Sequence, residues 1–593
     1  MPNPSPTSSN PLFRLAFYAL AIGMALTHVF ITFRGLSSAT GMEQAQMARE
    51  MARGNPFQTK VIRPYAWAVL TQTGRSPAPA AMPDITQPPL QPLLLAPVFK
   101  LLHRHQTYEP GKNGAIFLLD RAVACIGAAG LLLTLFWTHG SARKLFDDTI
   151  AGVTVAVLLV CEPLWELAVS GSAVALLMPL MALAVRLLVS ASLAAHQDRS
   201  SGGTLFLLGM VAALMALTHW LAIWLVLGLV LAVVLALPEK RSLSIRVALI
   251  PILALTGWGW WIQQACGDPL GGAKAIFQTH LLNLDATALQ RQFSLGMPPV
   301  QVTEMLRKLL LNWQTQFGEL GTQFGYSFPA VCFFLALMHR FRRAETNAVK
   351  RALGALLLAT ALGMGFIGLP EGRLDDNQLY LTLVPALSIY GAAMLAVLWA
   401  RLNPMAGGTW GRLGYAFMAV GISSLPLLNV LPAQIKLGMT MRNRIYPHWP
   451  PYVPANVSLL NKLLDPGEIL FADAPWFTAW YVDVPSVWIP IKRDEFEPMK
   501  TLAEAQGAKV AGFVITPISS HVEYVHEALS GPYREWPDLI FRGPMVAFDR
   551  EFPARPGFPY KVPLPLVAIP VGPKENLSLQ MTFYTDRPRT VKE

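Results

Sequence analysis

Four carboxylates in this sequence stand where a general base could act. Glu43 opens the amphipathic stretch GMEQAQMAREMARGNP, Asp84 precedes a Gln-Pro-Pro turn, and Glu162 and Glu166 interrupt the apolar run CEPLWELAVSG. A carboxylate can accept the proton of an attacking hydroxyl group, and carboxylates within an apolar segment usually face a polar cavity. Each also has a structural interpretation: Glu43 complements a helix dipole, Asp84 forms an ordinary turn, and Glu166 reaches the membrane interface.

The candidate substrate-binding cations are Lys60 and Arg63, which follow the amphipathic stretch, and Arg373 in the loop EGRLDDNQLY. The same loop supplies three further polar candidates: Asp375, Asp376 and Tyr380. Arginine binds phosphate through two parallel hydrogen bonds, so arginines beside apolar segments suit an anionic headgroup. The alternatives are that Lys60 and Arg63 are solvated or headgroup-facing charges, and that an aspartate of the loop caps the following helix.

The elements that must position these residues are those of a membrane protein. The 593 residues are 53% hydrophobic and 14% charged, with a mean hydropathy of +0.40, whereas soluble proteins carry about 25% charge. The net charge of +11 is explained by basic loops at a membrane surface, so we do not expect nucleic acid as a partner. The four cysteines show no metal-ligand spacing, and we expect no cofactor and find no indication of a divalent metal.

Apolar runs of about 20 residues, enough to cross a bilayer, recur along the first three quarters of the chain. We predict eleven transmembrane helices, near 12–33, 114–138, 149–169, 172–192, 204–218, 220–237, 246–264, 326–340, 352–369, 377–400 and 413–434. With the N-terminus inside, the inside loops contain thirteen basic residues and the short outside loops contain only Arg373. Counting 88–102 as a span would reverse this bias, so we interpret it as a helix at the interface.

The chain is therefore predicted to be an α-helical polytopic membrane protein with its long segments outside. Residues 1–11 form a disordered tail, 12–434 a transmembrane domain with outside loops 34–113 and 265–325, and 435–593 a small extracytoplasmic α/β domain. The predicted strands of this domain are ILFAD (469–473), SVWIP (486–490), AGFVIT (511–516) and LIFRG (539–543). PWFTAWYV, EFEPMKTLAEAQ and HVEYVHEAL are predicted helices between them.

Several features together resemble the polytopic GT-C glycosyltransferases, in particular the branch of protein mannosyltransferases and bacterial aminoarabinose transferases. These features are one membrane anchor, an outside amphipathic helix opening with an acidic residue, a PPL element, Asp120-Arg121 before a span, and inside loops of the ARKLFDD type. LYLTLVPALSIYGAAML resembles the late span of that family, and ADAPWFTAWYVDVPSVWIP resembles the outside domain of some bacterial members. The resemblance covers about residues 12–434.

The resemblance implies transfer of a sugar from a polyprenyl-phosphate carrier to a glycan, lipid or protein acceptor on the outer face of the membrane. By position the family's catalytic acid falls on Glu43, where the family usually has Asp. A second family acid would fall near Ser172, and Glu166 is its possible substitute, with Asp84 as a further candidate. Arg373 is the candidate partner of the carrier phosphate. The implied location is the bacterial inner membrane, with the N-terminus in the cytoplasm, the C-terminal domain in the periplasm and membrane lipids around the helices.

Two alternatives remain open. The first is a GT-C-like protein that has lost activity and serves assembly, which fits Glu43 in place of Asp and the missing second acid. The second is a polytopic transporter, although the sequence shows no inverted repeat and places its polar mass on one side.

Overall fold

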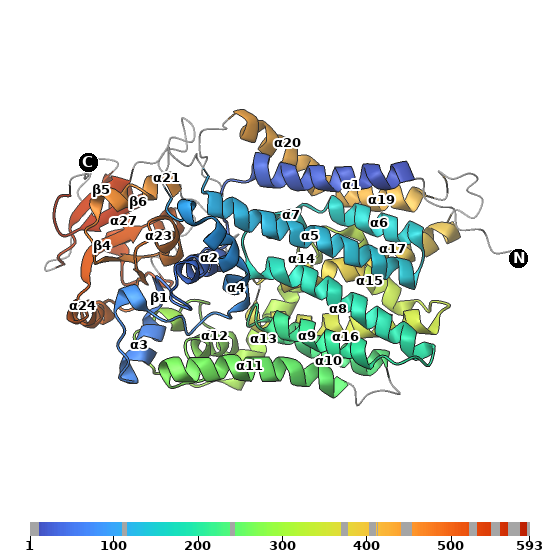
Figure 1. Cartoon of the computed structure of the whole chain (residues 1–593), viewed down its shortest axis with the longest axis horizontal. Coiled ribbons are helices and arrows are strands. Elements are labelled where there is room, and N and C mark those ends of the chain that lie inside the picture. The colour runs from blue at the N-terminus through green and yellow to red at the C-terminus, as the bar shows by residue number, and fades with distance from the viewer. Residues whose placement is uncertain are drawn as a thin grey trace, which may run out of the picture.

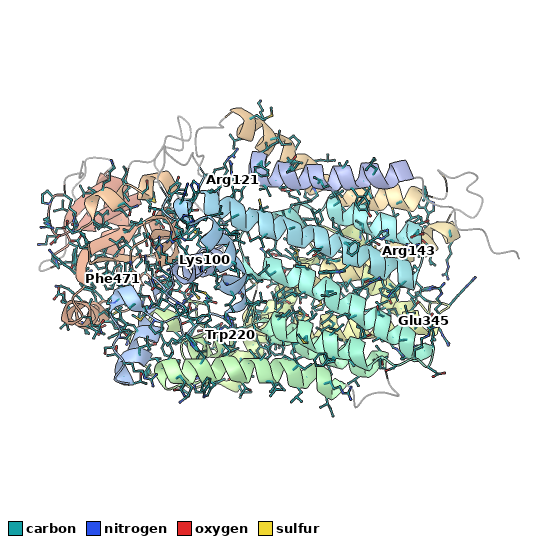
Figure 2. All side chains as sticks on the ribbon, viewed as in Figure 1. Lys100, Arg121, Arg143, Trp220, Glu345 and Phe471 are labelled. Carbon is teal, nitrogen blue, oxygen red and sulfur yellow. The ribbon has the colours of Figure 1, made fainter. Side chains whose placement is uncertain are left out.

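The computed structural model of the chain describes residues 11–108, 116–237, 244–368, 377–402, 411, 413–440, 454–520, 530–546, 558–566 and 581–589. Long helices lie side by side in a bundle, and a sheet with short helices lies at one end of it (Figure 1). Arg143 and Glu345 lie at the opposite end of the bundle, far from Phe471 in the sheet (Figure 2). The predicted basic loop after Arg143 and the sheet are therefore at opposite ends of the helices.

The long helices follow the predicted apolar runs. Six helices among the described residues are long and apolar enough to cross a membrane. They are α1 (Pro11–Leu26) continued by the π-helix η1 (Thr27–Thr32), α5 (Leu118–Leu145), α8 (Ala173–His196), α11 (Ser244–Cys266), α16 (Ala344–Ile367) and α17 (Leu379–Leu402). Two bent pairs add one span each if their halves are taken together: α6 (Asp148–Leu159) with α7 (Glu162–Val169) at 61°, and α19 (Gly414–Ser423) with α20 (Leu425–Thr440) at 49°.

The other three predicted spans are shorter apolar helices: α9 (Gly202–Ala216), α10 (Ala222–Ala236) and α15 (Phe328–Met338). At 1.5 Å per residue, a 15-residue helix such as α9 extends about 22 Å, less than the roughly 30 Å of hydrocarbon in a bilayer. The described helices thus give six to eight candidate spans where the apolar runs predict eleven. Hydropathy detects an apolar run, but it does not fix how many of its residues stay in one helix.

Packing within the bundle relies on close backbone approach, whereas the outer helices expose apolar side chains. A Cβ atom on Gly391 in α17 would lie 1.6 Å from the carbonyl oxygen of Pro329 in α15, so these two helices meet backbone to backbone. On the outside, Leu15 in α1 and Leu253 in α11 are more than half exposed. Such faces suit lipid tails, which are as apolar as leucine.

The sheet at the end of the bundle has six strands in the order β1-β3-β2-β4-β6-β5. The strands are β1 (Val61–Ile62), β2 (Glu468–Ala472), β3 (Ser486–Trp488), β4 (Lys509–Ile515), β5 (Val562–Leu566) and β6 (Met581–Thr585). The first four strands in this order pair in parallel, and β6 and β5 pair antiparallel. The edge strand β1 comes from the loop 34–113 that follows the first span, so the sheet joins that loop to the C-terminal region.

The helices of the C-terminal region confirm part of the prediction and correct one element. PWFTAWYV forms α23 (Pro475–Tyr481) and EFEPMKTLAEAQ forms α24 (Phe496–Ala505), whereas HVEYVHEAL lies outside the described residues. LIFRG is not a strand; it lies within the helix α27 (Pro537–Val546). Its Leu539 and Ile540 are buried, and a short apolar run does not by itself distinguish a buried helix from a strand. The remaining short elements of this region are α21 (Pro454–Val457), α22 (Leu460–Leu463), η6 (Arg493–Glu495) and α25 (Pro517–Ser520).

The two long loops 34–113 and 265–325, which were predicted to lie outside, fold into short helices. The second loop forms α12 (Ala273–Leu281), η5 (Leu289–Arg291), α13 (Val302–Gly318) and α14 (Leu320–Gln323). The first loop forms α2 (Ala39–Ala52), α3 (Pro64–Gln72), η2 (Pro79–Ala81), α4 (Leu90–Leu101) and η3 (His103–His105). The run 88–102 predicted to lie at the interface is thus largely the helix α4, which packs on α2.

The helix α2 begins two residues earlier than Gly41, the predicted start, because Ser38 caps it: the Gly41 amide donates to Ser38 Oγ at 2.8 Å. Glu43 therefore lies in the second turn rather than at the helix start. The polar face predicted for α2 does not face solvent, since Gln46 and Arg49 are fully buried. Figure 1 shows α2 between the bundle and the sheet region.

Candidate functional site

A cavity of about 1200 Å³ lies where the end of the first span meets α7, α14, α17 and the bent pair α19–α20. One wall is polar and includes Ser38, Ser170 and Ser172. The side formed by α17 and the bent pair is mainly apolar, with Leu381, Ile422, Leu425, Pro426 and Val430, and it also carries the amides of Gln378, Asn429 and Gln434. Pockets for small molecules typically measure about 300 to 1,000 Å³, so this space accommodates a ligand of considerable size.

Charged groups of both signs face the cavity. The carboxylates are Glu162, Glu166 and Glu319, and the guanidinium group is that of Arg34. Glu166 is exposed to this space, and among the described residues it has no cationic partner. The bend between α6 and α7 brings Glu166 to the cavity: α7 starts anew at Glu162 after a turn of 61°.

Arg34 follows the first span directly and is partly buried. It donates a hydrogen bond to the Phe33 carbonyl oxygen at 2.9 Å, but it pairs with none of the described carboxylates. Burial and the neighbouring Arg121 lower the pKa of Arg34. Arg121 itself lies over the ring of Phe30 at 5.9 Å, and its Nε is buried without a partner. Among the described residues neither cation pairs with a carboxylate, and Arg34 lines the cavity, so this part of the cavity suits an anion.

A histidine and a carboxylate lie deeper in the same cavity wall. The ring of His28 stacks on Trp165 with centroids 4.9 Å apart, and its Nε2 lies 3.8 Å from Glu162 Oε2. Neither atom has a hydrogen-bond partner among the described residues. Both residues line the cavity, although these two atoms are themselves buried.

A second cluster contains three of the predicted site residues. Glu43 in α2 pairs with Arg63 at the start of α3: Arg63 Nη1 donates to Glu43 Oε1, and Nη2 donates to Oε2 at 2.6 Å. Gln87 Nε2 also donates to Glu43, at 3.3 Å, and Arg63 Nε donates to Gln290 at 2.9 Å. Glu43 is 2% exposed and Arg63 7% exposed. The pair is thus a buried, hydrogen-bonded ion pair.

Asp84 completes this cluster. Its Oδ1 accepts hydrogen bonds from the backbone amides of Thr86 at 2.7 Å and Gln87 at 3.0 Å, and its Oδ2 has no partner. Burial and the nearby Glu43 carboxylate raise the pKa of Asp84 to about 6, although Arg63 opposes the shift. The space beside Arg63 and Asp84 measures about 10 Å³, roughly the volume that one water occupies. The cluster is closed to a sugar in this conformation.

The two clusters are neighbours joined by the backbone. The amides of Ser37 and Ser38 donate to the Ser170 carbonyl oxygen at 3.1 and 3.2 Å. Gln91 Nε2 donates to the Gly171 carbonyl oxygen at 2.7 Å. Gly171 has a φ of +86°, and its carbonyl group lies where a Cβ on Gly41 would have to fit, at 2.6 Å. The polar wall of the cavity is therefore fixed to the start of α2, a few residues before Glu43.

The other predicted site residues lie elsewhere. Lys60 Nζ pairs with Asp483 at 2.5 Å in the C-terminal region, away from the cavity lining. Tyr380 is buried, and its hydroxyl group donates to Gln316 in α13 at 2.7 Å. Arg373, Asp375 and Asp376 lie outside the described residues. Among the described residues, no three His, Cys, Asp or Glu side chains are arranged to hold a metal ion.

Sequence reasoning did not select Arg34 or His28 as site residues. Arg34 carries a signal that was available, because it is the first cation after the first span on the predicted outer side. The sequence signal at His28 is weaker, because a single histidine in an apolar span often only packs in the core and has no functional role. The carboxylate near His28 is that of Glu162, which the sequence analysis noted only as a carboxylate within an apolar segment.

Comparisons with solved structures identify the fold. The structure of the oligosaccharyltransferase AglB from Archaeoglobus fulgidus in complex with an inhibitory peptide and a dolichol-phosphate has a TM-score of 0.50 and 10% identity, covering 87% of this chain and 71% of AglB. An Archaeoglobus fulgidus oligosaccharyltransferase in complex with Zn and sulfate has a TM-score of 0.50 and 12% identity, covering 87% and 70%. ArnT from Cupriavidus metallidurans bound to undecaprenyl phosphate has a TM-score of 0.48 and 17% identity, covering 87% and 95%.

No protein-family model and no curated protein matches the sequence. The likeness to the archaeal oligosaccharyltransferases shows the fold, and it agrees with the predicted helical membrane bundle that carries a small sheet region at one end.

Proposed function

We propose that this chain, which has the fold of polytopic GT-C glycosyltransferases, transfers a sugar from a polyprenyl-phosphate carrier to an acceptor on the outer face of the membrane. The observation that carries the proposal is the cavity of about 1200 Å³, which exposes Arg34 and Glu166 to one space between a polar and an apolar wall. The bundle end that carries the sheet is the outer end in this proposal, because thirteen basic residues then lie in the inside loops.

Each wall of the cavity suits one part of such a donor. The apolar side chains of the bent pair α19–α20 would contact the first isoprene units, and Arg34 would bind the phosphate. The serines and carboxylates of the polar wall would hydrogen-bond sugar hydroxyl groups. A lipid donor needs a site with both kinds of surface, because its tail is stabilised by apolar contacts and its charged headgroup by polar ones.

The reaction requires a proton acceptor and a stabilised leaving group. The acceptor hydroxyl oxygen forms a bond to the anomeric carbon, while the bond from that carbon to the phosphate oxygen breaks and the lipid phosphate leaves with the electron pair. The hydroxyl proton passes to a carboxylate, and Arg34 stabilises the charge on the departing phosphate. No cofactor is needed to balance this step.

The exposed Glu166 is the carboxylate best situated to be the base. Glu43, the position that the family resemblance favours, would first have to leave Arg63, because both of its oxygens accept hydrogen bonds from that guanidinium group. Asp84 faces a space of about 10 Å³. We therefore propose Glu166 as the base, and the Glu43–Arg63 pair as support for the cavity wall through α2.

The test compares Glu166→Gln with a matched control in the same assay. In cells that lack the chain, a lipid-linked sugar should accumulate and a sugar should disappear from a surface glycan, both measured by mass spectrometry. Glu166→Gln should restore transfer about 10² to 10⁴ times more slowly than the wild type, the usual contribution of a general base. Glu504→Gln, an exposed glutamate in α24, should restore it fully. Wild-type transfer by Glu166→Gln would exclude Glu166 as the base, and unchanged lipid-linked sugars in the deletion would exclude the function.

A further inference from the structure

The C-terminal region is joined to α2 by a cluster of five charged residues, called here the Asp483 cluster: Arg49, Glu50, Arg53, Lys60 and Asp483. Glu50 Oε1 lies 2.8 Å from Arg53 Nη1 and 3.2 Å from Lys60 Nζ. Asp483 contacts all three cations: Arg49 Nη2 lies 2.9 Å from its Oδ1, Arg53 Nη2 2.7 Å from its Oδ2, and Lys60 Nζ 2.5 Å from its Oδ1. Burial opposes the charged form, but the three cations outweigh it and hold the pKa of Asp483 at about 2. Lys60 also donates to the backbone oxygen of Asp483 at 3.1 Å.

Arg49 does more than neutralise Asp483. It is fully buried, and its guanidinium group lies over the ring of Trp480 at 4.7 Å. Its Nη1 donates to the Trp480 carbonyl oxygen at 2.8 Å, and its Nη2 donates to that of Ala479 at 2.9 Å. These carbonyl groups belong to the last turn of α23, where no intrahelical donor is available. An arginine from α2 thus caps a helix that lies 430 residues later in the chain.

The same end of α23 is fastened to the transmembrane bundle. Trp480 Nε1 and Tyr481 Oη each donate to the Asp120 carboxylate at 2.7 Å, and Asp120 lies in the first turn of α5. The strand β1, which follows α2, pairs in parallel with β3. The C-terminal region is therefore attached to the membrane domain at three points close to α2.

The opposite end of α2 forms part of the cavity. Its N-cap Ser38 lines the polar wall, and the Ser38 amide donates to the Ser170 carbonyl oxygen at 3.2 Å. Because α2 has 14 residues, it extends about 20 Å from this wall to the Asp483 cluster, and Glu43 lies between the two ends. A buried helix of this length transmits a displacement of one end to the other.

We propose that Arg49 and Asp483 are positioning residues, through which the C-terminal region holds α2 and thereby fixes Ser38 and the polar wall of the cavity. The C-terminal region is then part of the catalytic unit rather than an appended module. The effect on transfer rests on the proposed function, whereas the effect on α2 does not. Misplacing a reacting group by about 1 Å can cost about 10² in rate, so a small movement of α2 has a measurable consequence.

The main variant is Asp483→Asn in the full-length chain. Asp483 has a φ of +65°, a conformation that asparagine tolerates and most other residues do not, so this change removes the charge without straining the backbone. We expect faster hydrogen exchange of the α2 amides, with no change in α24. We also expect kcat to fall about 10²-fold, while KM for the lipid donor changes less than about threefold because Arg34 and the apolar wall remain.

The matched control is Asp465→Asn, the same substitution in an exposed ion pair of the same region. Asp465 Oδ2 lies 3.0 Å from Arg587 Nη2, and both side chains are about half exposed. An exposed pair contributes little to stability, so exchange and kcat should match the wild type. If Asp483→Asn does not fold, Arg49→Lys replaces it: the ammonium group keeps the charge but cannot reach Asp483 and two carbonyl oxygens together, and an intermediate kcat is expected.

The outcomes separate the two proposals. Unchanged exchange of α2 in the Asp483 variant, or faster exchange with an unchanged kcat, overturns the positioning role. A parallel rise in KM with an unchanged kcat also overturns it, because that pattern indicates lost donor binding. If the wild-type chain transfers no sugar, the proposed function fails, and the exchange of α2 alone decides whether the Asp483 cluster holds this helix.

Discussion

Replacing Glu43 by Gln distinguishes a catalytic from a structural role for this carboxylate. Glu43 is 2% exposed, and both of its oxygens accept hydrogen bonds from Arg63. The substitution leaves the Arg63 guanidinium group buried with a neutral amide, and breaking a buried ion pair in this way costs about 3 to 5 kcal/mol. Asp84 remains near Arg63 and offsets part of that cost. We therefore expect the free energy of unfolding to fall by about 3 kcal/mol, at the lower end of that range.

The assay is thermal unfolding in detergent, followed by tryptophan fluorescence, together with transfer measured on the folded fraction. The double variant Glu43→Gln/Arg63→Met removes both charges, so it should unfold at a higher temperature than Glu43→Gln alone. The exposed control Glu504→Gln should unfold at the wild-type temperature. The reasoning is refuted if Glu43→Gln unfolds like the wild type and its folded fraction transfers sugar about 10² to 10⁴ times more slowly, because that result identifies a base.

Three further measurements test other parts of the structure. The pKa of Asp84 is raised from 3.8 to about 6, so between these pH values the folded state holds a proton that the unfolded state has lost. The resulting stabilisation of the folded state is about 3 kcal/mol below pH 4, and it is lost as the pH rises through 6. Asp84→Asn should remove this pH dependence of the unfolding temperature. Arg34→Lys should weaken binding of undecaprenyl phosphate, measured by native mass spectrometry, less than Arg34→Gln does, and equal affinity of all three proteins would exclude Arg34 as the phosphate ligand. An alkaline phosphatase fused to the C-terminus should be active. If that fusion is inactive and a second fusion, to a reporter that fluoresces only in the cytoplasm, is fluorescent, the proposed orientation is wrong.

Local sequence patterns were sufficient to predict the apolar helices and the three central strands of the sheet. Each predicted apolar run is mainly helical in its described residues, with a break in 149–169 and in 413–434, because a lipid environment leaves the backbone few alternatives. The strands β2, β3 and β4 were predicted from apolar runs bounded by turn residues. LIFRG failed the same test, because its flanking Pro537 starts the helix α27 and its apolar residues pack against the sheet as one helix face.

The site was less predictable, because the partners of its residues come from distant parts of the chain. Position alone favoured Glu43 as the base. In the structure its carboxylate accepts hydrogen bonds from Arg63 and Gln87, and no sequence pattern predicts that these three residues are in contact. Glu166 lines the cavity, which agrees with the expectation that a carboxylate in an apolar segment faces a polar space, and its role as a base stays a prediction. Lys60 was predicted to bind substrate, and its partner Asp483 lies 423 residues away.

The helix α2 shows why an amphipathic pattern is not enough to assign a surface. Its polar residues predict a face toward solvent or membrane headgroups, yet Arg49 is fully buried. Arg49 Nε has no hydrogen-bond partner among the described residues, so acceptors for the two terminal nitrogens and a nearby negative charge must stabilise the buried guanidinium group. The C-terminal region supplies these: the two free carbonyl groups of α23 and the Asp483 carboxylate. It follows that the polar face of α2 and the end of α23 are two halves of one structure, and a chain that lacks the C-terminal region would leave Arg49 buried without partners or expose α2. The loss of that region should therefore disturb the cavity wall at Ser38, even though none of the described residues beyond 440 lines the cavity.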